Sequence, residues 1–185
     1  MINIRLLSRL VLLFALTACS TSKEAITSFR STFDFSKVKT YSTYDRNSPF
    51  GEIQNLSGST RNTIELSIEQ NLDNKGLSYK TPKSADIVIS YYVISPDFSE
   101  LKRYNRQVKY CSYCLKVGQV SRQDLQSIVQ EGSLILDIID PKSQRSVWRS
   151  IYPLGFKEKD NSQEMQEKIT AAIDSMLHDY PKGND

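Results

Sequence analysis

Apolar residues recur at helical spacing in two separate parts of the chain. In residues 60–75, Ile64, Ile68 and Leu72 follow one another every four residues, which predicts an amphipathic helix with one apolar stripe. Met165, Ile169, Ile173 and Leu177 repeat this spacing near the C-terminus and predict a second helix of the same kind.

The ends of both helices carry recognisable signals. Ser59 or Thr60 is expected to cap the first helix, because a hydroxyl oxygen there can accept a backbone N–H. Gly76 suits the left-handed position after its last turn. In the second helix, Asn161 with Glu164 three residues later resembles a capping box.

Strand patterns separate the two helices. Residues 31–45 are aromatic and β-branched and predict a strand with an irregular middle. Residues 84–95 are apolar on both faces, which predicts a central strand covered on both sides. Residues 132–156 predict a hairpin that turns at 141–145. Residues 97–130 are harder to interpret; a strand near 107–120 and a short helix near 123–129 are expected there.

The length of the hairpin loop sets which side chains share a face. A loop of residues 141–145 pairs Asp137 with Arg149 on a polar face and places Ile138 with Trp148 on the core face, whereas a loop one residue shorter puts Asp137 beside Trp148. The longer loop is preferred because it separates charge from core. Asp137 is interpreted as an outward-facing residue paired across the hairpin; a buried carboxylate in a functional cleft is the alternative.

These elements predict one α+β domain over residues 29–181, followed by a tail of residues 182–185. The two amphipathic helices are expected to cover one face of a mainly antiparallel sheet, which gives a two-layer sandwich.

The N-terminus has the features of a secretory signal. Arg5 and Arg9 precede an apolar run from Leu10 to Leu16, which is too short to span a bilayer, since a spanning helix needs about 20 apolar residues. The run ends in Leu16-Thr17-Ala18-Cys19, which resembles the lipobox of bacterial lipoproteins.

That resemblance implies cleavage after residue 18, a diacylglyceryl thioether on Cys19 and acylation of the new amino terminus. Cys19 would then anchor the protein in a membrane durably, because several acyl chains act together. Ser20 in place of Asp suggests the outer membrane rather than the inner one. Residues 19–28 form a short tether with a reach of about 30 Å.

Removal of residues 1–18 changes the charge. The full chain has 24 Lys plus Arg and 21 Asp plus Glu, so loss of Arg5 and Arg9 leaves 24 − 2 = 22 against 21, a net charge of +1. A near-neutral mature chain does not support nucleic-acid binding as its general role.

Candidate chemistry is sparse. Cys111 and Cys114 form a C-x-x-C pair, which is compatible with a redox couple, half of a zinc site or a disulfide. In an oxidising compartment the pair left after lipidation of Cys19 is interpreted as a structural disulfide. The one histidine, His178, lies near a helix C-terminus, where a cation is favourable. No catalytic residue, metal or cofactor is predicted.

The segment around the cysteine pair is basic and contains no acid from Leu101 to Gln123. A solvated loop is the simpler interpretation. The functional one is a contact surface for anionic lipid headgroups, lipopolysaccharide phosphates or an acidic partner. Its residues are Lys102, Arg103, Arg106, Lys109, Tyr110, Tyr113 and Lys116.

Four stretches, "FDFSKVKTY", "ADIVISYYV", "GSLILDIIDPKSQRSVWR" and a closing helix that ends in "DYP", occur in an order that resembles the DUF4136 lipoprotein family. The resemblance covers roughly residues 33–95 and 131–181 and implies a periplasm-facing lipoprotein domain without assigned catalytic residues. The cysteine pair lies outside it.

Together these features predict a non-enzymatic, membrane-anchored lipoprotein at the periplasmic face of the outer membrane, with a role in envelope interaction or assembly. The alternative is a periplasmic thiol–disulfide or ligand-binding protein that works through the Cys111–Cys114 segment.

Overall fold

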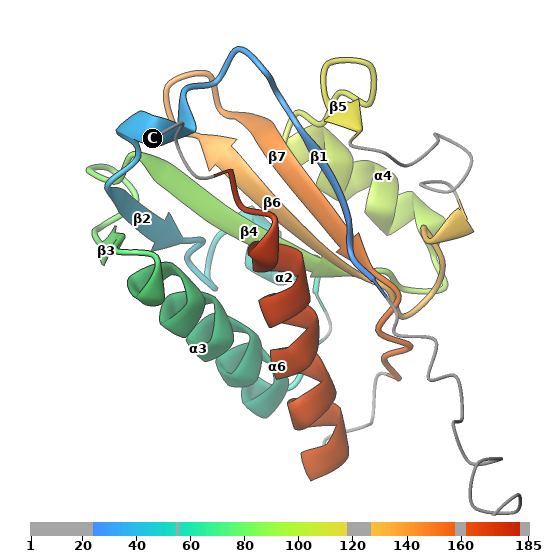
Figure 1. The fold of residues 1–185 in the computed structure, drawn as a ribbon. Coiled ribbons are helices and arrows are strands. Elements are labelled where there is room, and N and C mark those ends of the chain that lie inside the picture. The colour runs from blue at the N-terminus through green and yellow to red at the C-terminus, as the bar shows by residue number, and fades with distance from the viewer. Residues whose placement is uncertain (1–23, 55, 118–126, 158–161, 182–185) are drawn as a thin grey trace, which may run out of the picture.

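The computed structural model describes residues 24–54, 56–117, 127–157 and 162–181. These residues form one seven-stranded sheet with helices packed against it (Figure 1). The strands are β1 (Ile26–Phe29), β2 (Thr40–Thr43), β3 (Ser78–Tyr79), β4 (Ile87–Val93), β5 (Lys116–Val117), β6 (Leu134–Asp140) and β7 (Arg145–Tyr152). The helices are the short 3-10 helix η2 (Phe35–Lys37) and α2 (Pro49–Glu52), α3 (Gly58–Asn74), α4 (Phe98–Gln107) and α6 (Gln163–His178).

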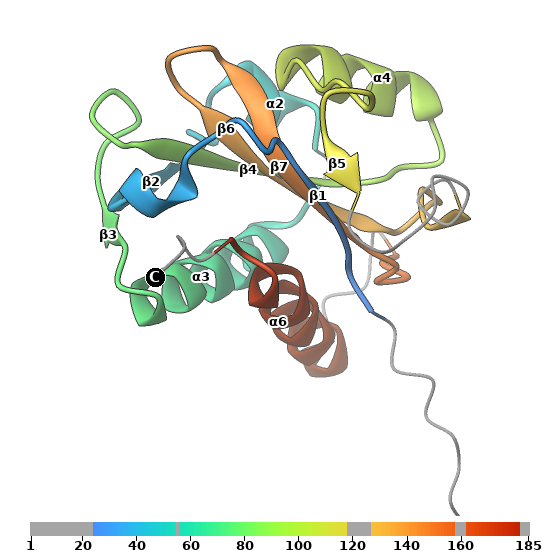
Figure 2. The same ribbon diagram turned by 45° about the horizontal axis from the view of Figure 1, so that its top comes forward.

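The strand order is β3-β2-β4-β6-β7-β1-β5. β2 runs parallel to β3 and β4, and every other neighbouring pair is antiparallel. α3 and α6 lie side by side on one face of this sheet (Figures 1 and 2). The predicted α+β class, the mainly antiparallel sheet and the two helices on one face are therefore confirmed.

The opposite face is also covered, by α4 and α2 (Figure 2). β4 shows this directly, because its side chains alternate between two hydrophobic clusters. Ile87 and Ile89 belong to the cluster under α3 and α6, whereas Val88 and Tyr92 belong to the cluster under α4. The prediction of a central strand covered on both sides is confirmed, and the burial of the second face comes mainly from a helix that the sequence analysis missed.

The β6–β7 hairpin has the predicted register. Asp137 pairs with Arg149, and Ile138 pairs with Trp148. Ile138 and Trp148 lie in the core under α3 and α6, and both are fully buried. Arg149 is on the face away from these two helices, as predicted.

The turn that produces this register differs from the prediction. Asp140 pairs with Arg145, so the loop is residues 141–144, one residue shorter than expected. On its own, this shorter loop would have placed Asp137 beside Trp148. A β-bulge between Ile138 and Ile139 adds Val147 as an extra residue on β7. The extra residue shifts the pairing by one, so that Asp137 again lies opposite Arg149.

Helix ends follow the expected chemistry with small shifts. α3 is capped by Ser57, two residues before the predicted site; its side chain accepts the Thr60 N–H at 3.1 Å. Gly76 has the predicted left-handed φ of 81°, and the Leu77 N–H reaches back to the Leu72 carbonyl. Ser162 caps α6; Asn161 lies outside the described residues. No helix in the described part of the chain is long and apolar enough to span a bilayer.

The N-terminal region departs most from expectation. The strand predicted over residues 31–45 is realised only in β2, because Phe35 belongs to η2, which the Asp34 side chain caps. β1 instead takes Ile26–Phe29, of which residues 26–28 were expected in the tether. The folded domain therefore begins three residues before residue 29.

Candidate functional site

α4 builds most of the candidate site. Asp97 caps its start by accepting the Ser99 N–H at 2.8 Å. At its end, Lys109 takes a left-handed φ of 45°, and the Tyr110 N–H donates to the Asn105 carbonyl, which is a Schellman motif without glycine. Within the described residues 107–117, the strand expected over residues 107–120 is wrong apart from the two residues of β5. Residues 118–120, and most of the short helix expected near 123–129, lie outside the described residues.

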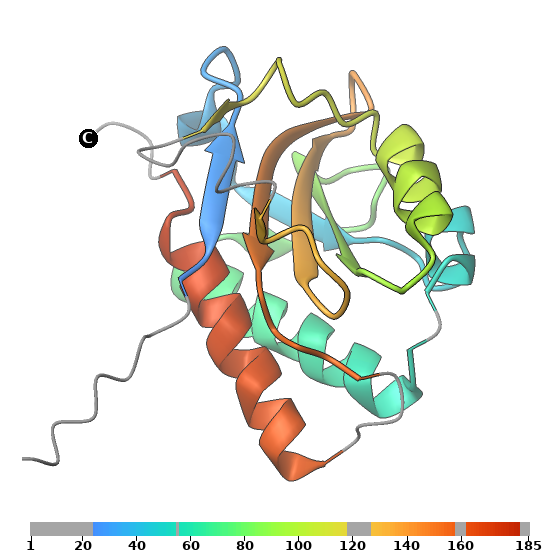
Figure 3. The ribbon, with the colours of Figure 1, turned by 90° about the vertical axis from the view of Figure 1, so that its right-hand side faces the viewer.

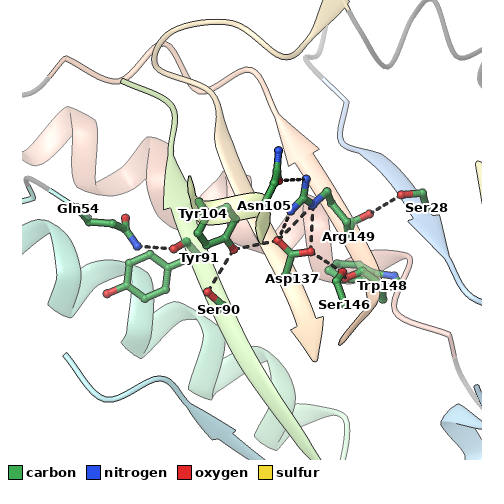
Figure 4. Close-up of polar contacts among 10 residues, drawn as sticks. All are labelled: Ser28, Gln54, Ser90, Tyr91, Tyr104, Asn105, Asp137, Ser146, Trp148 and Arg149. Atoms are coloured by element: carbon green, nitrogen blue, oxygen red, sulfur yellow. Dashed lines mark hydrogen bonds and ion pairs between the residues drawn. The ribbon is translucent and has the colours of Figure 1, made fainter. Parts of the chain in front are cut away.

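Beneath α4 lies a buried polar cluster, which we define as Ser90, Tyr104, Asp137, Ser146 and Arg149 (Figure 4). The Asp137 carboxylate accepts hydrogen bonds from the Tyr104 hydroxyl at 2.8 Å and from the Ser146 hydroxyl at 2.5 Å. Arg149 approaches the same carboxylate through Nε, 3.0 Å from Oδ1, and through Nη2, 2.8 Å from Oδ2. This fork-on-fork geometry gives a strong charge-assisted pair.

Arg149 also ties the pair to α4. Its Nη1 donates to the Asn105 Oδ1 at 2.8 Å, and its guanidinium lies 3.5 Å from the centre of the Tyr110 ring. Burial alone would lower the pKa of Arg149, but the neighbouring Asp137 carboxylate outweighs it and raises that pKa. Arg149 therefore stays charged.

Burial and the Asp137 charge raise the pKa of the Tyr104 hydroxyl well above its ordinary value. Tyr104 thus remains a donor at any physiological pH. Its ring stacks on Tyr92, with centroids 4.8 Å apart. The cluster holds α4 to the sheet through side chains from β4, β6, β7 and α4 itself.

The cluster corrects the predicted exposure of Asp137 and adds three residues to its predicted pair with Arg149. Asp137 is paired across the hairpin as predicted, but it is 0% exposed and does not face outward. Ser90, Tyr104 and Ser146 were not identified from the sequence. The signals were present: Ser90 and Ser146 interrupt apolar strands, and Tyr104 lies at helical spacing from Leu101.

All five predicted cations are exposed, and we call them together the basic surface: Lys102, Arg103, Arg106, Lys109 and Lys116. Lys116 lies on β5, and the other four lie on α4 or just after it. Lys102 and Arg106 lie four residues apart on α4 and therefore share one side of the helix. None of the five forms an ion pair within the described part of the chain. Lys109 donates to the Gln144 Oε1 at 3.0 Å.

The two tyrosines expected at the contact surface, Tyr110 and Tyr113, lie in different environments. Tyr113 is 81% exposed and adjoins the basic surface. Tyr110 is half-buried over Arg149, so it supports the site from within. The basic segment was expected to be a loop, but its first part, residues 101–107, belongs to α4 instead.

Cys111 and Cys114 form the predicted disulfide, with Cα atoms 5.2 Å apart. It closes a turn immediately after α4, in which the Cys114 N–H donates to the Cys111 carbonyl at 3.0 Å. Over the described ranges, no group of three or more His, Cys, Asp or Glu side chains has a metal-binding arrangement. Cys19 lies outside those ranges, and His178 occupies the last turn of α6 as predicted.

Similarity to one solved structure supports the fold. A DUF4136 family protein from Bacteroides thetaiotaomicron matches with a TM-score of 0.53 and 17% identity, over 85% of this chain and 94% of that one. A PDZ domain protein from Parabacteroides distasonis has a TM-score of 0.48 and 16% identity, over 88% of this chain and 36% of that one. A PelC dodecamer from Paraburkholderia phytofirmans has a TM-score of 0.41 and 10% identity, over 82% and 95%.

Among proteins with curated descriptions, none matches the chain. The family model of DUF4136, a domain of unknown function, matches residues 25–182, which include every strand and helix described above. That span is most of the chain, and it agrees with the resemblance carried by the sequence. The chain belongs to the DUF4136 family.

Proposed function

We propose that this protein is a non-enzymatic lipoprotein of the bacterial envelope, anchored through Cys19 at the periplasmic face of the outer membrane. In this proposal the basic surface contacts the phosphates of anionic lipid headgroups in the leaflet that holds the anchor. The observation that carries the proposal is the set of five exposed cations in a segment, residues 101–117, that contains no acidic residue. Three of them, Lys102, Arg103 and Arg106, lie on α4.

The short connection between anchor and domain supports it. β1 begins at Ile26, so residues 20–25 are all that separate it from Cys19. These residues reach about 20 Å when fully extended. The domain would stay close to the bilayer, where each Lys or Arg near an anionic surface contributes about 1 kcal/mol.

The buried polar cluster supports a structural rather than a catalytic use of its charges. Both Asp137 oxygens accept hydrogen bonds from protein donors, and Arg149 is 2% exposed. The charged groups in the interior thus serve to hold α4 rigidly, and the charges on the outer face of α4 are the ones that a partner can reach.

Lysine footprinting tests the contact. The full lipidated protein is reconstituted in vesicles of phosphatidylcholine, with or without phosphatidylglycerol, and its amines are labelled with a membrane-impermeant reagent. Anionic vesicles should protect Lys102, Lys109 and Lys116, and high salt should remove the protection. Three exposed lysines elsewhere serve as internal controls: Lys39, Lys80 and Lys83.

A variant with Arg103→Glu and Arg106→Glu should lose this protection, whereas the matched control with Lys80→Glu and Lys83→Glu should keep it. Equal protection in neutral and anionic vesicles, or equal protection of both sets of lysines, would refute the lipid contact. Protection seen in whole envelopes and not in vesicles would refute it too and would indicate an acidic protein partner.

The anchor has its own test. Cys19→Ala should abolish incorporation of radiolabelled fatty acid and leave the precursor uncleaved. Fatty-acid labelling that persists in this variant would show that Cys19 is not the anchor.

A further inference from the structure

A pocket of about 350 Å³ lies where β4 ends and the chain enters α4. Figure 3 shows the ribbon of this connection between β4 and α4. The apolar wall of the pocket includes Ile53, Tyr92, Ile94 and Phe156, which are all buried. This volume is in the range of sites that hold small organic molecules. None of the residues predicted from the sequence to form a site lines the pocket.

Three carboxylates line the same pocket: Asp97, Glu100 and Glu131. None of them forms an ion pair with any residue that the structure describes. Hydrogen bonds from Ser99 lower the pKa of Asp97, so its carboxylate is ionised at neutral pH. Glu100 accepts a hydrogen bond from the Ser95 hydroxyl at 2.8 Å, which fixes it beside the pocket. The pocket therefore has an acidic lining over an apolar wall.

Gln54 adds an acceptor. Its side-chain nitrogen donates to the Tyr91 carbonyl, which fixes the orientation of the amide (Figure 4). Its Oε1 is buried and receives no hydrogen bond from any described residue. A buried acceptor of this kind is stabilised by a donor.

We propose that this pocket binds a small organic cation, namely a protonated amine attached to an apolar body about the size of one aromatic ring. The apolar body would contact the Tyr92 and Phe156 side of the pocket. The ammonium group would lie among the carboxylates, within reach of the Gln54 acceptor. An anionic ligand of the same shape is disfavoured by repulsion from three acids.

The proposal is tested on the full chain in nonionic detergent with two fluorinated probes. 4-Fluorophenethylamine carries the ammonium group, and 2-(4-fluorophenyl)ethanol has the same apolar body without the charge. In a fluorine NMR titration the amine should bind saturably and about tenfold more tightly than the alcohol, and the difference should shrink with salt.

Two single variants locate the site. Glu100→Gln and Glu131→Gln should each weaken amine binding by about three- to tenfold while leaving alcohol binding unchanged. Glu167→Gln, an exposed change of the same kind on α6, should leave both unchanged. The proposal is overturned if the amine shows no saturable binding, if the alcohol binds as tightly, or if Glu167→Gln weakens amine binding as much as the pocket variants do.

Discussion

Replacement of Arg149 by Met should destabilise the fold strongly. The change keeps an unbranched apolar stem and removes the guanidinium group, which leaves the fully buried Asp137 carboxylate with hydroxyl donors alone. Two short charge-assisted hydrogen bonds are lost, at 3.0 and 2.8 Å. At about 1.5–3 kcal/mol each, they give a loss of about 3–6 kcal/mol. The usual cost of breaking a buried pair, about 3–5 kcal/mol, agrees.

Urea denaturation followed by Trp148 fluorescence measures this loss. Trp148 is the only tryptophan and is 0% exposed, so its emission reports unfolding of the core. Arg103→Met is the matched control, because Arg103 is exposed on α4, the helix that covers Arg149; it should change the free energy of unfolding by about 0.5 kcal/mol or less.

Asp137→Asn combined with Arg149→Met should cost about 2–3 kcal/mol less than the sum of the single changes, because the cluster acts as a unit. A loss in the free energy of unfolding below about 1 kcal/mol for Arg149→Met would contradict the argument, since an uncompensated buried charge destabilises a fold by more than that. Strict additivity of the two changes would contradict it as well.

Three further outcomes are expected. Replacing both Cys111 and Cys114 by Ser should lower the free energy of unfolding by about 1–2 kcal/mol at most, because only a short loop is released; a larger loss in urea titrations would contradict a local role. Backbone and hydroxyl hydrogen bonds lower the pKa of Asp86. Its contribution to stability is therefore present above the unfolded pKa and is lost as the pH falls through the folded pKa, so Asp86→Asn should flatten the decline in stability below about pH 4. Lys109→Gly should raise the melting temperature by about 2–4 °C per kcal/mol gained, because glycine removes the strain of the positive φ; a lower melting temperature would show that the Lys109 side chain matters more.

The periodic parts of the chain were predictable. A stripe such as Ile64, Ile68 and Leu72 specifies a helix and its buried face from local sequence alone, and Gly76 specifies where that helix ends. The hairpin shows a limit of such reasoning. Two errors cancelled, because the turn is one residue shorter than predicted and the bulge at Val147 compensates for it. The pattern of apolar and polar side chains on the two faces of the hairpin depends only on the total number of loop and bulge residues, so it does not show how they are divided between loop and bulge.

α4 and the buried polar cluster were not predicted, for physical reasons. The outer face of α4 is so rich in Lys and Arg that its narrow apolar stripe, including Leu101 and Tyr104, gave little helical signal. Burial of Asp137 depends on Tyr104, which is 33 residues away in sequence, and on an arginine across the hairpin. Local pattern cannot distinguish a charge pair exposed to solvent from one that a remote helix covers.

The position of β1 determines how the domain responds to mechanical tension. β1 is hydrogen-bonded to β7 on one side and to β5 on the other, and it is the first element of the residues that the structure describes. A pull on the chain before Ile26 directed along the strand loads these bonds together in shear, because antiparallel bonds run perpendicular to the strand axis. A pull at the C-terminus acts first on α6, which apolar side chains hold to the sheet. The domain should therefore withstand more force at its N-terminus than at its C-terminus.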